Sequence, residues 1–378
     1  MSTSDWSLPE IDVFEQIRTT LANDDAAVLA TVIAVDGSAY RRPGAKMLIQ
    51  PDGGGAGSIT AGCLEDEVRA LATDVLDDGA PRVETWDLTG DDDDTWGLGI
   101  GCNGVITVLL EPLDESYQKV VDARQAGEAI GVATVVSSET DTTVGDRGYY
   151  VPDDGVTDGL PEPIRDSLAE SAKTLVSAGN SETLTVDTDA GSVDVFVDGV
   201  RPPPELVVFG SGHDVGPVIE LARLVDFRTT VVSFRGGQAT EDRFPQANTV
   251  VSSSPREVQS IREWDSDTYA VVMSHNFLDD RLTLEQLMET SVPYIGLMGP
   301  QERFDEMHED IADENESIPD AELERIYTPI GVSLGGDTPY QIAFSIVAEL
   351  LAVVHDRTPQ HLSRREGPIH DRVSVETD

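Results

Sequence analysis

The 378-residue chain is predicted to be an α/β protein of two domains. We expect a pseudo-duplicated N-terminal α/β domain, followed by a C-terminal Rossmann-like domain with a doubly wound parallel sheet. Three observations predict this. An internal repeat fills the first half, Pro202, Pro203 and Pro204 follow one another between the halves, and apolar strands alternate with helices in the second half. Hydrophobic residues make up 39% of the chain, and with its 33 glycines this composition is that of a folded protein.

The repeat in the first half consists of short matching segments offset by 100 to 103 residues. Each copy has the pattern strand, glycine-containing loop, strand, helix, strand. The helices are expected to end at Gly79 and Gly179. We therefore predict an N-terminal domain over residues 1–199, with repeats at about 26–115 and 130–198. Two pairs of segments carry the match: 30–33 with 133–136, and 47–53 with 149–155.

Reactive residue types gather in the first copy. The second copy keeps the strand and helix pattern but has neither a cysteine nor an arginine pair. Cys63 and Cys102 both lie beside glycines, whereas a structural cysteine usually lies in an apolar run. The alternative is that the first copy merely has a longer glycine loop. We favour a cofactor site, with these candidates: Arg41, Arg42, Gly44, Lys46, Ser58, Gly62, Cys63 and Cys102.

The chemistry of this candidate site depends on Cys63 and the basic residues. Cys63 lies at the start of a predicted helix, whose dipole favours the thiolate, although the acidic residues 65–67 oppose it. Arg41, Arg42 and Lys46 form a rare basic cluster that could hold a phosphate, with bidentate bonds from arginine. Their alternative role is to pair with the many nearby acids.

The charge balance excludes several classes of partner. There are 25 basic and 71 acidic residues, so the formal net charge is −46. Duplex nucleic acid and anionic membranes are poor partners for such a chain. The acids are spread along the sequence and lysine is scarce, which is typical of a halophilic surface. With no apolar run of membrane length and no signal-peptide pattern at the start, we expect a cytoplasmic protein.

The second half begins after a proline-rich linker at 200–204, which no helix or central strand can contain. We predict a Rossmann-like domain over 205–357 and a polar tail over 358–378. The final helix has the clearest start, with Asp337 or Thr338 as its cap and Pro339 in its first turn. Four strands are expected, at 205–209, 229–234, 269–273 and 294–298.

The loop after the first of these strands resembles a dinucleotide-binding fingerprint. Gly210 and Gly212 match its first two glycines, but the third arrives one residue late, at Gly216. The second strand ends without the acid that NAD enzymes use, although Ser233 followed by Arg235 could accept the 2′-phosphate of NADP. The alternative is a sheet used as scaffold. Candidate binding residues in this crevice are Gly210, Gly212, His213 and His275.

Taken together, these motifs resemble the xanthine dehydrogenase accessory factor (XdhC/CoxI) family over about 330 residues. There are two departures, because Ser233 replaces a family aspartate and Asn276 stands where an aspartate is frequent. The matching segments, in order, are 37–47, 57–65, 101–104 with 110–112, 209–213, 274–276, 294–299 and 329–343.

The resemblance implies a chaperone of the molybdenum cofactor (molybdopterin). Such a protein binds the cofactor, protects it while a cysteine desulfurase adds the terminal sulfur, and delivers it to a xanthine dehydrogenase or CO dehydrogenase type of molybdenum hydroxylase. Cys63 is then the expected contact to molybdenum or its sulfur, since soft thiolates suit that chemistry. We expect a homodimer and an accessory role with no catalytic residues. Two other hypotheses stay open, an NADP-dependent oxidoreductase and a thiol redox or sulfur-transfer enzyme.

Overall fold

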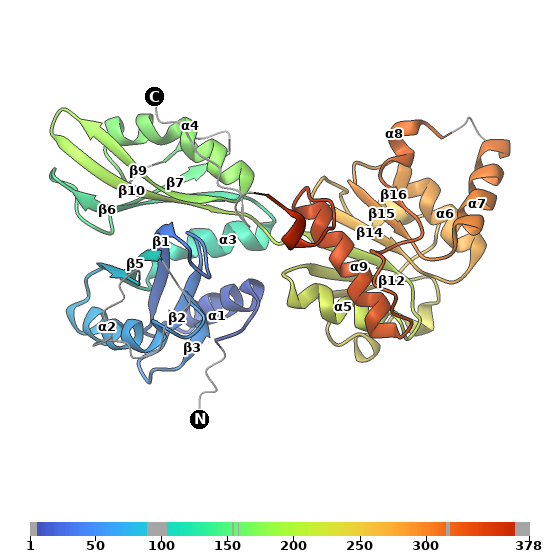
Figure 1. The fold of residues 1–378 in the computed structure, drawn as a ribbon, viewed down its shortest axis with the longest axis horizontal. Coiled ribbons are helices and arrows are strands. Elements are labelled where there is room, and N and C mark those ends of the chain that lie inside the picture. The colour runs from blue at the N-terminus through green and yellow to red at the C-terminus, as the bar shows by residue number, and fades with distance from the viewer. Residues whose placement is uncertain (1–5, 89–103, 153–154, 158, 315–317, 367–378) are drawn as a thin grey trace. The chain divides into compact units, whose positions relative to one another are not determined.

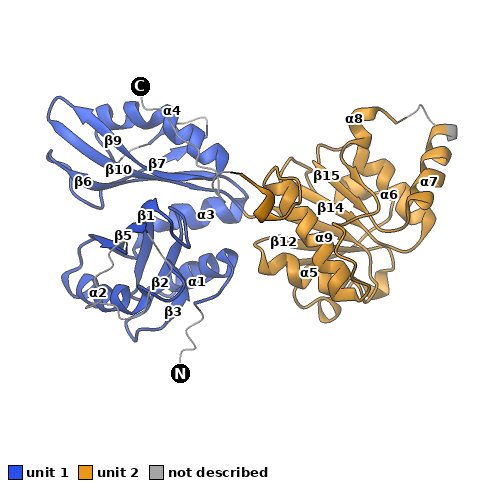
Figure 2. Cartoon of the chain, viewed as in Figure 1, with its two compact units in different colours: residues 1–202, 371–378 blue, residues 203–370 orange. Residues whose placement is uncertain are grey.

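The structure is a computed structural model, which describes residues 6–88, 104–152, 155–157, 159–314 and 318–366. The chain divides into two compact units between Pro202 and Pro203 (Figure 2). The division lies in the run of prolines, where the chain from Arg201 to Pro204 has no helix or strand. Among the described residues, no helix is both long and apolar enough to cross a membrane.

The first copy of the repeat is a five-stranded antiparallel sheet with two helices. Its strand order is β3-β2-β1-β5-β4. Gly79, in the left-handed region at φ 65°, ends α2 as predicted, because a glycine reaches this conformation without strain. The elements are α1 (Glu10–Ala22), β1 (Val28–Gly37), β2 (Lys46–Ile49), β3 (Gly55–Gly57), α2 (Glu65–Asp78), β4 (Arg82–Asp87) and β5 (Gly104–Pro112).

The second copy repeats this arrangement element by element (Figure 1). Its strand order, β8-β7-β6-β10-β9, is the order of the first sheet with each strand replaced by its counterpart. The predicted duplication is therefore present, and it also includes a helix before each sheet, α1 in one copy and α3 in the other. The elements are η1 (Glu115–Tyr117), α3 (Gln118–Ala126), β6 (Ile130–Ser138), β7 (Arg147–Val151), β8 (Gly155–Val156), α4 (Glu162–Ala178), β9 (Ser181–Thr188) and β10 (Gly191–Val200).

The two copies share a core. One face of each sheet is covered by its own helix, α2 or α4, whereas α1 and α3 pack with side chains from both sheets. Two ion pairs cross this interface: Lys46 with Asp198, which is buried, and Arg147 with Glu111, which is partly buried. Each cation lies on the second strand of one copy, and its acid lies on the last strand of the other.

These two ion pairs occupy equivalent positions. Lys46 lies opposite Thr31 in the first sheet, as Arg147 lies opposite Thr134 in the second. Each of the two cations also lies near an aromatic ring. The Lys46 ammonium is 5.7 Å from the ring centroid of Phe14, and the Arg147 guanidinium is 5.8 Å from that of Tyr117. The first unit is therefore built as a pseudo-dimer within one chain.

The second unit has a six-stranded parallel sheet in the order β13-β12-β11-β14-β15-β16. This is the doubly wound Rossmann order, as the sequence predicted. Helices α5 and α9 cover one face, and α6 and α7 cover the other. The elements are β11 (Glu205–Phe209), α5 (Val215–Leu224), β12 (Arg228–Ser233), η2 (Gly236–Gln238), η3 (Glu241–Arg243), β13 (Thr249–Ser252), η4 (Val258–Ile261), β14 (Thr268–Val272), α6 (Phe277–Met288), β15 (Tyr294–Leu297), α7 (Gln301–Glu314), α8 (Asp320–Leu323), β16 (Ile326–Tyr327), α9 (Pro339–Val354) and η5 (Leu362–Arg364).

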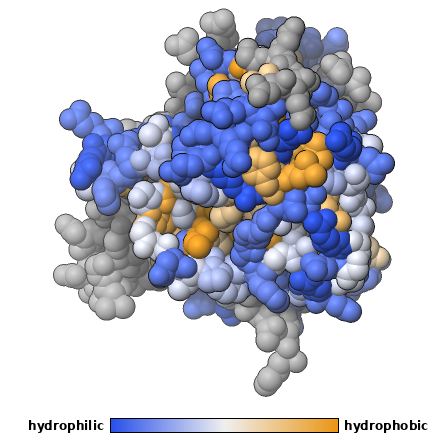
Figure 3. Space-filling view, turned by 90° about the vertical axis from the view of Figure 1, so that its right-hand side faces the viewer, coloured by the Kyte–Doolittle hydropathy of each residue, from blue (hydrophilic) through white to orange (hydrophobic). Residues whose placement is uncertain are grey.

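The start of α9 matches its sequence signals. Thr338 is the cap and forms a reciprocal capping box with Gln341, and Pro339 lies in the first turn. The molecular face shown in Figure 3 is mostly hydrophilic, with hydrophobic side chains in a few small patches. Such a surface agrees with the acidic composition of the chain.

Candidate functional site

Cys63 lies in a tightly bonded loop between β3 and α2. The hydroxyl of Thr60 accepts hydrogen bonds from the backbone N–H groups of Cys63 and Leu64, both at 3.2 Å. The buried carboxylate of Glu65 in turn accepts from the N–H of Thr60 at 2.8 Å and from its hydroxyl. These bonds fix the loop just before α2 begins, which leaves Cys63 partly exposed beside Gly62.

A cavity of about 750 Å³ opens beside this loop. Its volume lies in the range of small-molecule sites. Three residues of the predicted site line it: Arg41, Ser58 and Gly62. Cys63 is the next residue after Gly62 but does not itself line the cavity. The complete lining is Trp6, Ser7, Leu8, Tyr40, Arg41, Ser58, Thr60, Ala61, Gly62, Glu65, Asp66 and Arg69.

The arginines near the cavity differ in their partners. Arg69 pairs with Asp66 at 3.1 Å and lies over the ring of Trp6. Arg41 has no ion pair or hydrogen bond with any residue that the structure describes, and the buried Nε of Arg42 is likewise unpaired there. In a chain of charge −46, an arginine without an acidic partner is available for an anionic ligand.

The other predicted residues of the first unit lie elsewhere. The Lys46 ammonium is buried between the two copies, 2.7 Å from Asp198, and it donates a hydrogen bond to the carbonyl of Gly44. A Cβ on Gly44 would lie 2.6 Å from the hydroxyl oxygen of Ser181, so this glycine permits close contact between the copies. The predicted basic cluster of Arg41, Arg42 and Lys46 therefore does not form one site, because the side chain of Lys46 lies in the interface between the two copies. Cys102 lies outside the described residues.

The second candidate site is the crevice at the carboxyl ends of the Rossmann strands. Here the loop after β11 approaches the loop after β14, because the Nε2 atom of His275 is 2.7 Å from the carboxylate of Asp214. His275 has a φ of 59°, a left-handed conformation that strains a residue other than glycine. His213 is exposed on the glycine loop. The structure therefore brings Gly212, Asp214 and His275 together.

The carboxylate of Asp214 lies against Gly212, the second glycine of the loop. In Rossmann enzymes the second glycine of the loop lets the pyrophosphate approach the backbone at the helix N-terminus. A Cβ on Gly212 would lie only 2.3 Å from a carboxylate oxygen of Asp214. The space that Gly212 leaves open is thus filled by a carboxylate of the chain, held there by His275.

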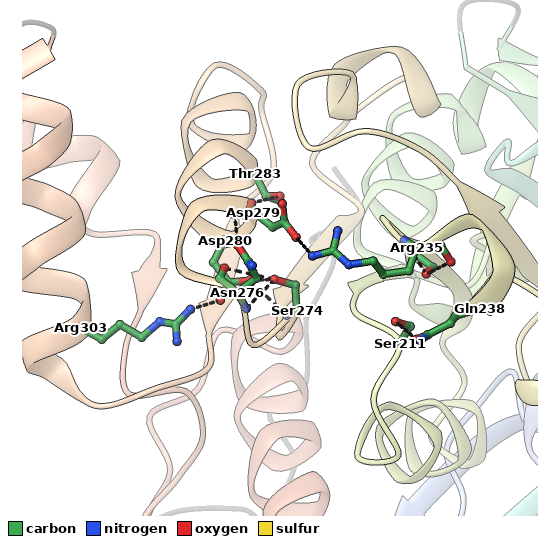
Figure 4. Close-up of polar contacts among 10 residues, drawn as sticks. Ser211, Arg235, Gln238, Ser274, Asn276, Asp279, Asp280, Thr283 and Arg303 are labelled. Atoms are coloured by element: carbon green, nitrogen blue, oxygen red, sulfur yellow. Dashed lines mark hydrogen bonds and ion pairs between the residues drawn. The ribbon is translucent and has the colours of Figure 1, made fainter.

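The arginine that could bind a 2′-phosphate is also engaged. Figure 4 shows Arg235, just after β12, reaching Asp279 in the first turn of α6, at 2.8 Å. The adjacent Asp280 is buried and bonds to Ser274 and Arg303. Burial raises the pKa of Asp280, although its bonds to Ser274 and Arg303 oppose this change. One aspartate therefore lies against Gly212, and another is paired with Arg235.

We accordingly expect neither NADH nor NADPH to bind the wild-type protein at micromolar concentration. The double variant Asp214→Ala with Asp279→Asn removes both carboxylates and should bind NADPH at least about tenfold more tightly, because repulsion at the helix N-terminus is relieved. Isothermal titration calorimetry of both proteins measures this. Micromolar NADPH binding by the wild type, unchanged in the variant, would contradict the expectation, and turnover of a carbonyl substrate would favour an oxidoreductase.

The sequence of this chain is similar to known families and proteins. Residues 20–87 match the XdhC and CoxI family, and residues 206–350 match the XdhC Rossmann domain. A probable xanthine dehydrogenase subunit of Bacillus subtilis (strain 168) is 28% identical over 335 residues, covering 88% of this chain and 94% of that protein. The molybdenum cofactor insertion chaperone PaoD of Escherichia coli (strain K12) is 22% identical over 338 residues, covering 88% of this chain and 85% of that protein.

A solved structure agrees with the fold of the whole chain. The crystal structure of a xanthine dehydrogenase from Bacillus halodurans superposes with a TM-score of 0.74 at 28% identity, covering 95% of this chain and 98% of that one. The two family matches fall on the first copy of the repeat and on the Rossmann unit, the two parts that contain the sequence motifs. The chain belongs to the XdhC and CoxI family.

Proposed function

We propose that this protein is an accessory factor that binds the molybdenum cofactor, supports its sulfuration and inserts it into a molybdenum hydroxylase of the xanthine dehydrogenase or CO dehydrogenase type. The observation that carries the proposal is the cavity beside Cys63, with Arg41 unpaired on its wall among the described residues. Two relatives support the role, since one is named a molybdenum cofactor insertion chaperone and another a probable xanthine dehydrogenase subunit.

The residues at the cavity suit this cargo. The cofactor has a phosphate, which Arg41 can bind through charge-assisted hydrogen bonds. Its molybdenum is a soft centre that accepts thiolate contacts, and Cys63 is held at the edge of the cavity by the bonds around Thr60. Lys46 belongs to a structural ion pair and has no place in this site. The work of the chain is to bind, orient and shield its cargo.

The proposed partners follow from this role. A cysteine desulfurase must approach the loop of Cys63 to supply sulfur, and the client enzyme must receive the cofactor afterwards. Cys63 is partly exposed and Gly62 is exposed, so the loop is accessible from solvent. We retain the homodimer as part of the proposal. An NADP-dependent role for the second unit is less favoured, because Asp214 lies against Gly212 and Asp279 is paired with Arg235.

The test is to purify the protein anaerobically from its own host and to analyse its bound molecules by mass spectrometry and ultraviolet-visible spectroscopy. We expect a bound molybdopterin with molybdenum. The Rossmann unit offers a matched control variant, Arg235→Gln, which should retain the same amount of pterin. Bound NADP in place of pterin would support the oxidoreductase hypothesis. Protein isolated with neither, even when the client is co-expressed and inactive, would contradict the proposal.

A further inference from the structure

The wall of the cavity contains two aromatic side chains, Tyr40 and Trp6. Tyr40, on the loop between β1 and β2, is 66% exposed. Trp6 precedes α1, packs on the edge of the core of the first copy and carries the guanidinium of Arg69 over its ring, 5.9 Å from the centroid. Flat, accessible aromatic faces bind planar rings through stacking and burial of apolar area.

An anion-binding group lies next to these aromatics. Arg41 follows Tyr40 in the chain and lines the same cavity. The two acids of the lining are already engaged, since Glu65 accepts from Thr60 and Asp66 pairs with Arg69. The cavity therefore offers a planar surface close to a cation that no described residue pairs with, and together they suit a ring system that carries a phosphate.

The thiol of Cys63 is not part of this group of aromatic and basic side chains. Cys63 does not line the cavity, although it follows Gly62, which does. A ligand can thus occupy the cavity and meet Arg41 without any contact to the sulfur. The groups that recognise the ring and the phosphate are separate from the one group that suits a metal.

From this separation we propose that the cavity recognises the organic part of the cargo, a phosphorylated pterin, and binds it with or without metal. Cys63 adds a contact only when molybdenum is present. The proposal rests on the proposed function, and it extends the cargo to the metal-free pterin. Tyr40 binds the ring plane, Trp6 adds apolar contact beside it, and Arg41 binds the phosphate.

The test uses the fluorescent phosphorylated pterin that forms when metal-free molybdopterin is oxidised. Its binding is measured by fluorescence anisotropy with the wild type and the variants Tyr40→Ala, Arg41→Gln and Cys63→Ala, in a buffer in which each shows a wild-type melting curve. We expect Tyr40→Ala and Arg41→Gln to weaken binding about tenfold or more, and Cys63→Ala to change it less than about twofold. Tyr340→Ala and Arg18→Gln, at residues that do not line the cavity, are matched controls.

A second probe isolates the role of Arg41. The dephosphorylated pterin should bind the wild type about tenfold more weakly, and Arg41→Gln should then cause no further loss. Equal loss with both probes would overturn the assignment of Arg41 to the phosphate. If the complete cofactor binds the wild type but the metal-free pterin does not, the inference is wrong and the proposed function stands. If neither binds, the proposed function itself fails.

Discussion

Replacing Asp198 with alanine is expected to lower the free energy of unfolding of the first unit by about 3–5 kcal/mol. The substitution leaves the ammonium of Lys46 buried between the two copies without its partner. The side chains of Lys46 and Asp198 are only 5% and 7% exposed, so water cannot replace the lost carboxylate. Urea unfolding at constant salt, followed by circular dichroism, measures the change.

The protonation of Lys46 determines how this loss depends on pH. Burial alone lowers the pKa of Lys46, but the attraction and hydrogen bond of Asp198, together with the smaller effects of Tyr117 and Glu10, outweigh it, and the net pKa is raised above its ordinary value. For a lysine with a raised pKa, the stabilisation is complete below the ordinary pKa of about 10.4 and is lost as the pH rises through the raised value. The contribution of this ion pair to the stability of the wild type should therefore stay constant from about pH 6 to 9.

Two further variants test this prediction, one at the equivalent ion pair and one at an exposed control position. Glu111→Ala removes the equivalent acid beside Arg147 and should cost a similar or smaller amount, since the side chains of that pair are 9% and 12% exposed. Asp187→Ala, at an exposed position on β9, should change the free energy by less than about 0.5 kcal/mol. Equal unfolding midpoints for wild type and Asp198→Ala would show that the buried pair contributes no stability.

The fold was largely predictable because its signals are local. Glycines at the ends of α2 and α4, the proline and cap at the start of α9, and the repeated segments all act within a few residues. Within the Rossmann unit, the two strands that the sequence pattern does not indicate, β13 and β16, lie at the edges of the sheet. They have four and two residues, too few to show a hydrophobic period.

The candidate site was only partly predictable because its contacts are distant in the chain. In the sequence, Lys46 belongs to a basic cluster with Arg41 and Arg42, but its partner Asp198 lies 152 residues away. Trp6 carries no signal that ties it to the loop of Cys63. Tyr40 does carry one, since it stands directly before the arginine pair. An aromatic residue beside cations on a glycine loop is typical of a binding site, and this signal could have identified Tyr40.

The crevice of the Rossmann unit shows the same limit. Its glycine loop is visible in the sequence, and so is the missing acid at Ser233. That Asp214 folds back over Gly212 depends on His275, 61 residues later in the chain. The glycine fingerprint therefore predicted the fold of this unit correctly. Whether the loop can bind a dinucleotide depends on the side chain of Asp214, which the fingerprint does not specify.

Replacing Cys63 with alanine should reduce the molybdenum-loaded cofactor that the purified protein retains by about tenfold, roughly the effect of one lost soft contact. The melting temperature should stay close to that of the wild type. Cys63 is partly exposed, so its truncation leaves no enclosed cavity, and the bonds that hold its loop come from its backbone and from Thr60. The client hydroxylase should then accumulate in an inactive form with little cofactor or terminal sulfur.

The measurement is molybdenum and pterin per protomer, beside a melting curve for each variant. Cys63→Ser keeps the size of the side chain and replaces the soft sulfur with a hard oxygen, so it should lose as much molybdenum as Cys63→Ala. Cys102→Ala should have the smaller effect, because no helix is predicted to follow it and favour its thiolate. If Cys63→Ala retains as much molybdenum as the wild type, the thiol has no contact with the metal or its sulfur, and recognition of the cargo rests on the cavity alone.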